Sequence, residues 1–313
     1  MAEEATIAAE QAAPRPGFRT DERPEWLDPH EYPFTSREIE IEGCRVHYVD
    51  EGNGPVMLML HGNPTWSFLY REVIKGLRDD FRCIALDYPG FGLSTAPRGY
   101  GFTPEEHARI VERFVASLEL ANVTLMVHDW GGPIGFGAAT RDPGRYAAFV
   151  IGNSWAWPMT ENRDAERLSG FLGGPVGGFL IRDLNLFVRL LMPAVMRRRK
   201  LTREAKAAYR GPFRSRSSRR PLHVFPRAIL ASTAFLEEVE SGLGTLRDRP
   251  ALLVWGDRDP VFRTDVRERW ERLFERRHTV ILPGAGHFTP EEAPEEIVSA
   301  IRDWRGLAGA PWP

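Results

Sequence analysis

Short apolar runs alternate with amphipathic stretches along most of the chain. Residues 38–42 (EIEIE) and 44–50 (CRVHYVD) alternate apolar and polar side chains, and Glu42-Gly43 between them predicts the turn of a β-hairpin. Residues 56–60 (VMLML) are apolar throughout, which is typical of a strand buried on both faces of a parallel sheet. Runs of the same kind recur at residues 84–86, 123–127, 148–151, 252–255 and 279–282.

Helical patterns lie between these runs. They cover residues 66–77, 104–118, 132–140, 266–274 and 290–304. Thr103 precedes one of them as a candidate N-cap, and Glu106 stands at the third helical position, where it completes a capping box. Strands that alternate with helices predict a mostly parallel sheet flanked by helices, which is an α/β fold.

The stretch from residue 158 to residue 228 interrupts this alternation. It is helix-like and holds 16 lysines and arginines against five aspartates and glutamates, a formal charge of +11. We therefore predict a helical cap at 158–228, inserted into a core formed by residues 31–157 and 229–313. We interpret its charge, including the basic cluster at 197–200, as a solvated helix surface. Residues 1–30 lack periodicity and predict a loose N-terminal arm.

Composition and charge narrow the function classes. The chain is 42% hydrophobic and 27% charged, which excludes a disordered chain, a collagen and a coiled coil. A formal net charge of −2 argues against a nucleic-acid partner. No signal peptide and no run of about 18 apolar residues is present, so we expect a cytoplasmic protein without a membrane partner. Two cysteines are too few for a disulfide framework or a four-cysteine zinc site.

The segment with the clearest chemistry is residues 125–132 (LMVHDWGG), an apolar strand that leads through a tight turn into a helix. This is the context of a nucleophile elbow, with Asp129 at the nucleophile position. Gly131 and Gly132 leave room beside it. Val127 departs from the small residue that usually stands two positions before the nucleophile.

Two further loops follow apolar strands. Residues 284–288 (GAGHF) offer His287, and residues 252–262 (LLVWGDRDPVF) offer Asp257 and Asp259. The chain order of Asp129, acid and histidine is the order of the α/β-hydrolases. Because functional loops of parallel sheets gather at the carboxyl ends of the strands, we expect the three side chains to converge.

The motifs HGNPTWS (61–67), HDWGG (128–132) and GAGHF (284–288) resemble the haloalkane dehalogenases of the α/β-hydrolase superfamily, as does the cap stretch AAYRGPF (207–213). The resemblance covers roughly residues 35–305 and implies a mostly parallel eight-stranded sheet with an inserted cap. It implies Asn63 and Trp130 as the halide-binding N–H donors. The catalytic acid would be Asp259, in GDRDP. Asn153 stands at the family's other acid position and is expected to have no such role, so that Asn153→Ala should leave turnover intact. The combination of Asp129, His287 and Asp259 with an asparagine and a tryptophan as halide donors resembles the third of the family's subfamilies.

The resemblance implies a reaction without metal or organic cofactor. A carboxylate is ordinarily ionised at neutral pH, so Asp129 would attack an sp³ carbon directly and release halide. His287, oriented by Asp259, would activate water to hydrolyse the alkyl ester. The expected partners are a small halogenated aliphatic substrate, water and halide, and the subfamily also points to a homo-oligomer. The apolar pocket is expected to be lined by Trp66, Trp155, Phe171, Phe179 and Phe288.

Three other functions fit parts of the sequence. An epoxide hydrolase shares the Asp nucleophile but normally needs two cap tyrosines, and residues 158–228 contain only Tyr209. A fluoroacetate-type dehalogenase typically has arginine after the nucleophile, where Trp130 stands. A non-catalytic binding protein on the same fold also remains open, although the set of Asp129, His287 and Asp259 argues against it.

Overall fold

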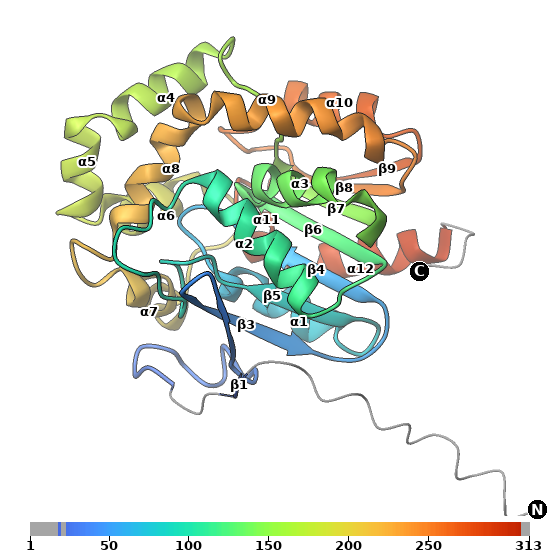
Figure 1. Ribbon diagram of the computed structural model, residues 1–313, viewed down its shortest axis with the longest axis horizontal. Coiled ribbons are helices and arrows are strands. Elements are labelled where there is room, and N and C mark those ends of the chain that lie inside the picture. The colour runs from blue at the N-terminus through green and yellow to red at the C-terminus, as the bar shows by residue number, and fades with distance from the viewer. Residues whose placement is uncertain (1–17, 20–22, 308–313) are drawn as a thin grey trace, which may run out of the picture.

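A mixed sheet of nine strands forms the centre of the computed structural model, which describes residues 18–19 and 23–307 (Figure 1). The strands are β1 (Phe18–Arg19), β2 (Arg37–Ile41), β3 (Cys44–Glu51), β4 (Val56–Leu60), β5 (Arg82–Leu86), β6 (Val123–Asp129), β7 (Tyr146–Ser154), β8 (Ala251–Gly256) and β9 (Arg277–Leu282). Their order across the sheet is β1-β2-β3-β5-β4-β6-β7-β8-β9.

The sheet is antiparallel at one edge and parallel elsewhere. The pairs β1–β2, β2–β3 and β3–β5 are antiparallel, whereas every pair from β5 across to β9 is parallel. Strands β2–β9 form the predicted eight-stranded, mostly parallel sheet, and β1 adds a two-residue ninth strand. All seven residues of β6 are buried, as the apolar run in the sequence predicts for a central strand.

Helices cover both faces of the sheet. In the core they are α1 (Arg71–Leu77), α2 (Pro104–Ser117), α3 (Gly131–Arg141), α9 (Thr233–Gly242), α10 (Thr264–Leu273), α11 (Thr289–Glu292) and α12 (Pro294–Leu307). Helices α2, α3 and α9 pack together on one face, and α1, α11 and α12 pack together on the other (Figure 1). The predicted capping box begins α2, with Thr103 Oγ1 accepting from the backbone N–H of Glu106.

The cap lies between β7 and β8. It consists of α4 (Arg163–Gly173), α5 (Pro175–Arg182), the π-helical turn η3 (Phe187–Leu191), α6 (Met192–Val195), α7 (Arg203–Arg210), the 3₁₀ turn η4 (Gly211–Phe213) and α8 (Arg220–Ala231). Helix α8 runs past the predicted boundary at residue 228. None of the helices in the described ranges is both long enough and apolar enough to cross a bilayer.

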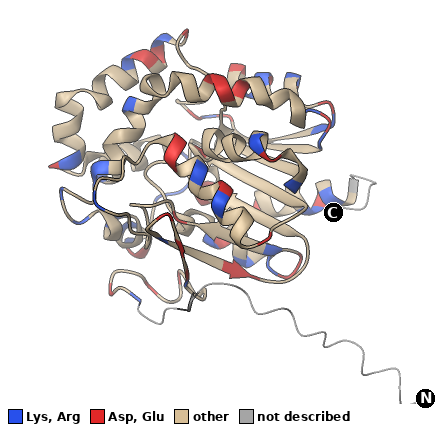
Figure 2. Ribbon diagram, viewed as in Figure 1, with Lys and Arg blue, Asp and Glu red and all other residues tan. Residues whose placement is uncertain are grey.

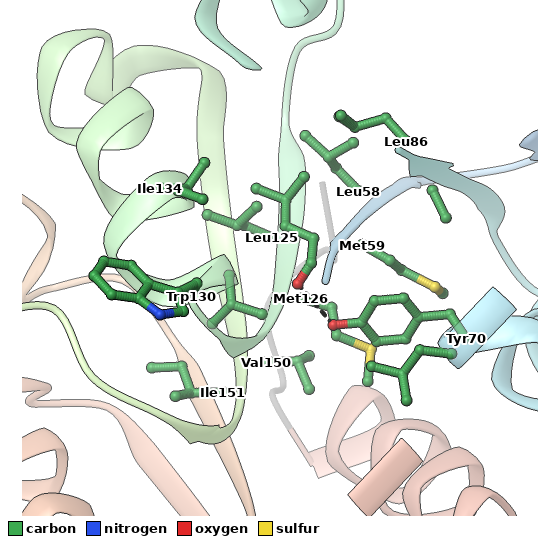
Figure 3. Packing of buried hydrophobic residues seen from close by; sticks show 14 of the residues in the cluster. Leu58, Met59, Tyr70, Leu86, Leu125, Met126, Trp130, Ile134, Val150 and Ile151 are labelled. Carbon is green, nitrogen blue, oxygen red and sulfur yellow. Dashed lines mark hydrogen bonds between the residues drawn. The ribbon is translucent and has the colours of Figure 1, made fainter. Parts of the chain in front are cut away.

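The hydrophobic core continues through the sheet to the loops that follow the central strands. Figure 3 shows Leu58, Leu125 and Val150 from three neighbouring strands close to Trp130 and Tyr70. The Tyr70 hydroxyl, at the end of the 3₁₀ turn η1 (Ser67–Tyr70), donates to the backbone carbonyl of Leu60 at 2.8 Å. This bond fixes η1 against the end of β4, immediately before the loop that carries Asn63.

The N-terminal arm joins the domain earlier than predicted. Residues 1–17 and 20–22 of the predicted arm lie outside the described residues. Within the remainder, Leu27 is buried and Trp26 packs edge-on against Trp66, with ring centroids 5.9 Å apart. Burial of these apolar side chains holds the chain to the core before residue 30.

Candidate active site

Asp129 occupies the sharp turn between β6 and α3. Its backbone lies in the left-handed region, with φ of 51°, a conformation that costs energy for a residue with a side chain. A Cβ atom at Gly131 would overlap the backbone carbonyl of Leu60, so only glycine permits this close turn. Helix α3 begins two residues after Asp129, and its positive N-terminal end favours negative charge at the carboxylate.

The Asp129 carboxylate has a defined partner on each oxygen. Oδ1 accepts from the backbone N–H of Asn63 at 2.7 Å, and Oδ2 lies 3.6 Å from His287 Nε2. A Cβ atom at Gly62 would overlap this carboxylate, which explains the glycine before Asn63. The backbone carbonyl of Asp129 accepts from the hydroxyl of Ser154 at 2.6 Å. Asp129 is therefore held by contacts from the loop after β4 and from the end of β7, the two strands that flank β6.

His287 lies in the loop between β9 and α11. Its Nδ1 is 3.0 Å from Asp259 Oδ2, so the ring joins the two carboxylates of Asp129 and Asp259. Its backbone carbonyl accepts from Nε2 of His128 at 2.8 Å, and its backbone N–H donates to Val195 O at 3.2 Å. Both the core and the cap thus position this loop.

The carboxylate of Asp259, in the loop after β8, accepts hydrogen bonds from other groups besides His287. Its Oδ1 accepts from the backbone N–H of Val261 at 2.7 Å, and its Oδ2 accepts from Asn153 Nδ2 at 2.8 Å. Burial opposes ionisation, but His287 and these hydrogen bonds together lower the pKa of Asp259 below its ordinary value. Asp257 is exposed and accepts from the backbone N–H of Gly284, away from His287.

Asn153 contributes to the site although the sequence assigned it no role. It is fully buried at the end of β7, and its Oδ1 accepts from the backbone N–H of Gly256 at 2.9 Å. Its Nδ2 donates to Asp259 Oδ2. The sequence signal was its position at the carboxyl end of a parallel strand, where a side chain reaches the functional edge of the sheet.

The two carboxylates change the proton affinity of His287. Burial alone would lower the pKa of its ring, but Asp259 and Asp129 outweigh burial and raise this pKa to about 10. Both carboxylates therefore favour the positively charged form of the ring.

A cavity of about 580 Å³ lies between the cap and the carboxyl ends of the strands. Asn63, Asp129, Trp130 and His287 meet at its inner wall. Its other lining side chains are mostly apolar: Trp155, Met159, Ala165, Leu168, Leu172, Phe187, Leu191, Met192, Val195, Pro226, Ile229, Pro260, Val261, Phe262, Val266 and Phe288. An apolar cavity with a few converging polar groups is typical of a site for a small apolar molecule.

The prediction of the cavity lining is wrong for three of its five residues. Trp155 and Phe288 line the cavity, but Trp66, Phe171 and Phe179 do not. Trp66 is fully buried elsewhere and donates its indole N–H to Ala208 O at 3.2 Å. Phe171 and Phe179 point outward and are each 56% exposed. Apolar patterning alone does not distinguish a cavity wall from the core or from the outer face of a cap helix.

The sequence also missed a polar part of the cavity lining. It consists of Asn162, Asp164, Arg263 and Asp265. Arg263 Nη2 lies 3.4 Å from Asp164 Oδ2, so an exposed ion pair joins the start of α4 to the loop after β8. No single motif contains these residues, because they come from two segments that are far apart in the chain.

Glu292, another residue without a sequence signal, ties the cap to the histidine loop. Its carboxylate is buried and accepts from the backbone N–H groups of Arg197 (2.6 Å), Arg198 (2.7 Å) and Gly286 (3.1 Å). A buried carboxylate is stabilised by such N–H donors, so Glu292 fixes the chain after α6 against the loop that carries His287.

Metal ligation has no obvious place among the described residues. No group of three or more His, Cys, Asp or Glu side chains there is arranged to hold a metal ion. Cys44 and Cys83 are both buried free thiols.

Comparisons with known proteins agree with this geometry. The model of the alpha/beta hydrolase fold family matches residues 55–294. Haloalkane dehalogenase 2 of Mycobacterium tuberculosis is 42% identical over 88% of this chain and 96% of that protein. Cis-3-alkyl-4-alkyloxetan-2-one decarboxylase of Shewanella oneidensis is 30% identical over 86% of this chain and 88% of that protein. The crystal structure of haloalkane dehalogenase DbeA from Bradyrhizobium elkani USDA94 matches with a TM-score of 0.80 and 26% identity, covering 87% of this chain and 97% of that one. From the family match, the 42% identity over most of both chains and the structural likeness, we conclude that this chain belongs to the haloalkane dehalogenases of the α/β-hydrolase fold.

Proposed function

We propose that this enzyme hydrolyses haloalkanes through a covalent ester on Asp129. A carboxylate oxygen of Asp129 attacks the halogen-bearing carbon in line, forms a carbon–oxygen bond and displaces the halide with its electron pair. The observation that supports this step is that Asp129 lines an apolar cavity together with Asn63, Trp130 and His287. An apolar wall favours a haloalkane and leaves the nucleophile poorly solvated.

The leaving halide gains negative charge as the carbon–halogen bond breaks. We assign its stabilisation to the side-chain N–H groups of Asn63 and Trp130, which lie on different loops beside Asp129. Trp130 is held by aromatic neighbours, with its ring centroid 4.7 Å from that of Trp155 and 5.1 Å from that of Phe225. Donors fixed before the reaction stabilise developing charge without reorganisation.

Ester formation also changes His287. It removes the negative charge of Asp129, one of the two carboxylates that raise the pKa of the histidine. The ring then releases its extra proton more readily and becomes a base for a water molecule. That water attacks the ester carbonyl carbon, and His287 takes its proton. Asp259 stabilises the resulting imidazolium. The products are an alcohol, a halide ion and one proton.

The oxyanion formed by water attack has a donor already in place. Asn63 donates its backbone N–H to Asp129 Oδ1 at 2.7 Å, so the same group is positioned to stabilise negative charge on that oxygen. Asn63 thus serves both half-reactions, with its side chain toward the halide and its backbone toward the ester.

Epoxide hydrolysis has weaker support. Tyr209 is fully buried and donates its hydroxyl to Glu291 Oε2 at 2.7 Å, and no tyrosine is among the residues that line the cavity. A ring oxygen would therefore lack the phenolic donors that the epoxide reaction uses. The 30% identity to an oxetanone decarboxylase makes a four-membered lactone the more informative competing substrate.

The deciding experiment measures bromide and proton release from a short 1-bromoalkane. We expect release by the wild-type enzyme and none by Asp129→Asn. We also expect His287→Gln to accumulate an adduct with the mass of the alkyl group, mapped to Asp129 by peptide mass spectrometry. Halide release by Asp129→Asn at the wild-type rate would exclude this mechanism. Turnover of a cis-3,4-dialkyl-oxetan-2-one without turnover of any bromoalkane would favour the decarboxylase reaction.

A further inference from the structure

His128 is a buried titratable side chain that the proposed reaction does not use. It stands directly before Asp129 on β6, and its ring is fully buried. It is not among the residues that line the cavity, so its ring does not meet a substrate bound there. Any effect of His128 on the reaction must therefore pass through another residue.

The ring of His128 contacts the loop that carries His287. Its Nε2 lies 2.8 Å from the backbone carbonyl oxygen of His287, and the two ring centroids are 4.8 Å apart. The same carbonyl also accepts from the backbone N–H of Thr289 at 3.0 Å. The Thr289 bond joins near neighbours in the chain, whereas the His128 bond reaches the loop from β6. The strand that carries the nucleophile therefore also holds the loop that carries the histidine.

This contact determines where the His128 ring carries its proton. A carbonyl oxygen can only accept, so Nε2 must be the donor. Burial, and after it the charge of His287, lower the pKa of His128 to about 4, so the ring is neutral at pH 7 and Nδ1 carries no proton. Nδ1 also has no hydrogen-bond partner within the described residues. His128 thus acts as a fixed donor and not as a carrier of protons.

The surroundings of His128 offer little to stabilise a charged ring. Strands β4 and β7, on either side of β6, contain no Lys, Arg, Asp or Glu, and β6 contains only Asp129. In Figure 2 these central strands are largely uncharged, and most charged residues lie on the helices and loops around them. A charged His128 would also oppose the imidazolium that forms on His287 during ester hydrolysis. A neutral donor holds the loop without this repulsion.

We propose that His128 is a positioning residue that fixes His287 relative to Asp129 for hydrolysis of the ester. This proposal rests on the proposed function. Alkylation of Asp129 needs the carboxylate and the halide donors but no base. Hydrolysis needs a water molecule within reach of both the ester carbonyl carbon and His287 Nε2, which lies 3.6 Å from Asp129 Oδ2. A displacement of about 1 Å can slow a reaction about a hundredfold, so releasing the loop from β6 should slow hydrolysis and spare alkylation.

Single-turnover kinetics with a short 1-bromoalkane separate the two steps. Rapid quenching and intact-protein mass spectrometry follow the formation and the decay of the alkyl-enzyme. His128→Phe keeps a ring but no donor, and we expect it to slow decay about tenfold to a hundredfold while formation stays within about twofold of wild type. His128→Gln should restore decay to within about threefold of wild type, because its amide nitrogen is as many bonds from Cα as the histidine Nε2.

His107→Phe is the matched control for these variants. His107 is also fully buried, but its ring stacks on Phe225 and makes no contact with the loop of His287. Formation and decay should both proceed at the wild-type rate in this variant. Equal slowing of the two steps in His128→Phe would overturn the proposal, since a general loss of packing acts on both. Decay in His128→Gln that is as slow as in His128→Phe would overturn it as well.

The hydrogen bond can also be tested without substrate, in the wild-type protein, even if His128→Phe does not fold. In ¹⁵N NMR spectra of histidine-labelled protein, we expect a neutral His128 with its proton on Nε2 from pH 6 to pH 8. Its signals are assigned by their absence from His128→Gln. A proton on Nδ1, or a charged ring in this range, would overturn the proposal. The expected NMR state without any alkyl-enzyme in the wild type would instead contradict the proposed function, and would leave the contact between His128 and His287 intact.

Discussion

Asn153 Nδ2 donates a hydrogen bond to Oδ2 of Asp259, the same carboxylate oxygen that contacts His287 Nδ1. Residues from the end of β7 and from the loop after β9 therefore meet at one oxygen atom of Asp259. Asn153 is itself held by the backbone N–H of Gly256, so the amide has little freedom to turn away. It orients the carboxylate without carrying charge.

This relationship changes the expected effect of Asn153→Ala. We predict that turnover of a bromoalkane falls roughly tenfold, because the lost hydrogen bonds leave buried groups without partners. Asp259→Asn should reduce it by roughly a thousandfold or more, since it removes the charge that stabilises the imidazolium. Steady-state kinetics of both variants at matched thermal stability measures the difference. Wild-type turnover in Asn153→Ala would restore the original expectation from the sequence.

Glu292→Gln tests the tie between the cap and the histidine loop. We expect the free energy of unfolding to fall by about 1–3 kcal/mol, because the amide cannot accept three backbone N–H groups as well as a carboxylate does. Turnover should fall as well, since Gly286 stands next to His287. The matched control is Glu295→Gln, an exposed partner of Arg199, which should change stability by less than about 0.5 kcal/mol. Equal effects of the two substitutions in urea unfolding would argue against the tie.

We predict that the buried ring of His107 makes the free energy of unfolding fall as the pH is lowered. Burial lowers the pKa of this ring to about 3, and its Nε2 has no hydrogen-bond partner within the described residues. Below pH 6.5 the unfolded chain binds a proton there that the folded protein excludes, so acid favours unfolding by up to about 1.4 kcal/mol per pH unit. His107→Phe, which keeps the stacking on Phe225, should therefore gain about 2 kcal/mol relative to wild type between pH 7.5 and pH 5. Urea unfolding of both proteins at pH 7.5 and pH 5 measures this gain. A stability difference between variant and wild type that is the same at the two pH values would contradict the prediction.

Substitutions at Trp66 and Trp155 distinguish a core residue from a residue of the cavity wall. Trp66→Phe should lower stability by about 1–2 kcal/mol, through the lost hydrogen bond to Ala208, and leave the ranking of bromoalkane chain lengths unchanged. Trp155→Phe enlarges the cavity and should shift that ranking toward longer chains. The check is KM across a series of 1-bromoalkanes. A changed ranking in the first variant only would reverse this assignment of the two residues.

Much of the fold was predictable because it depends on local patterns. The apolar runs at β4, β6 and β8 must be buried on both faces, and the capping box at Thr103 is satisfied within one turn of helix. The tight turn at Asp129 was also predictable, since Gly131 and Gly132 supply the small residues that such a turn needs. The ninth strand was missed because a two-residue strand has no period.

The sequence by itself determined the kinds of groups that the site contains and the order in which the strands deliver them. Only the tertiary structure decided which apolar residues form the cavity wall, which carboxylate contacts His287, and that Asn153 and Glu292 hold the site. The physical reason is that residue type and period depend on near neighbours in the chain. Contacts such as those of Asp259 with Asn153, or of Glu292 with Arg197, join segments about a hundred residues apart and depend on how the sheet and the cap pack.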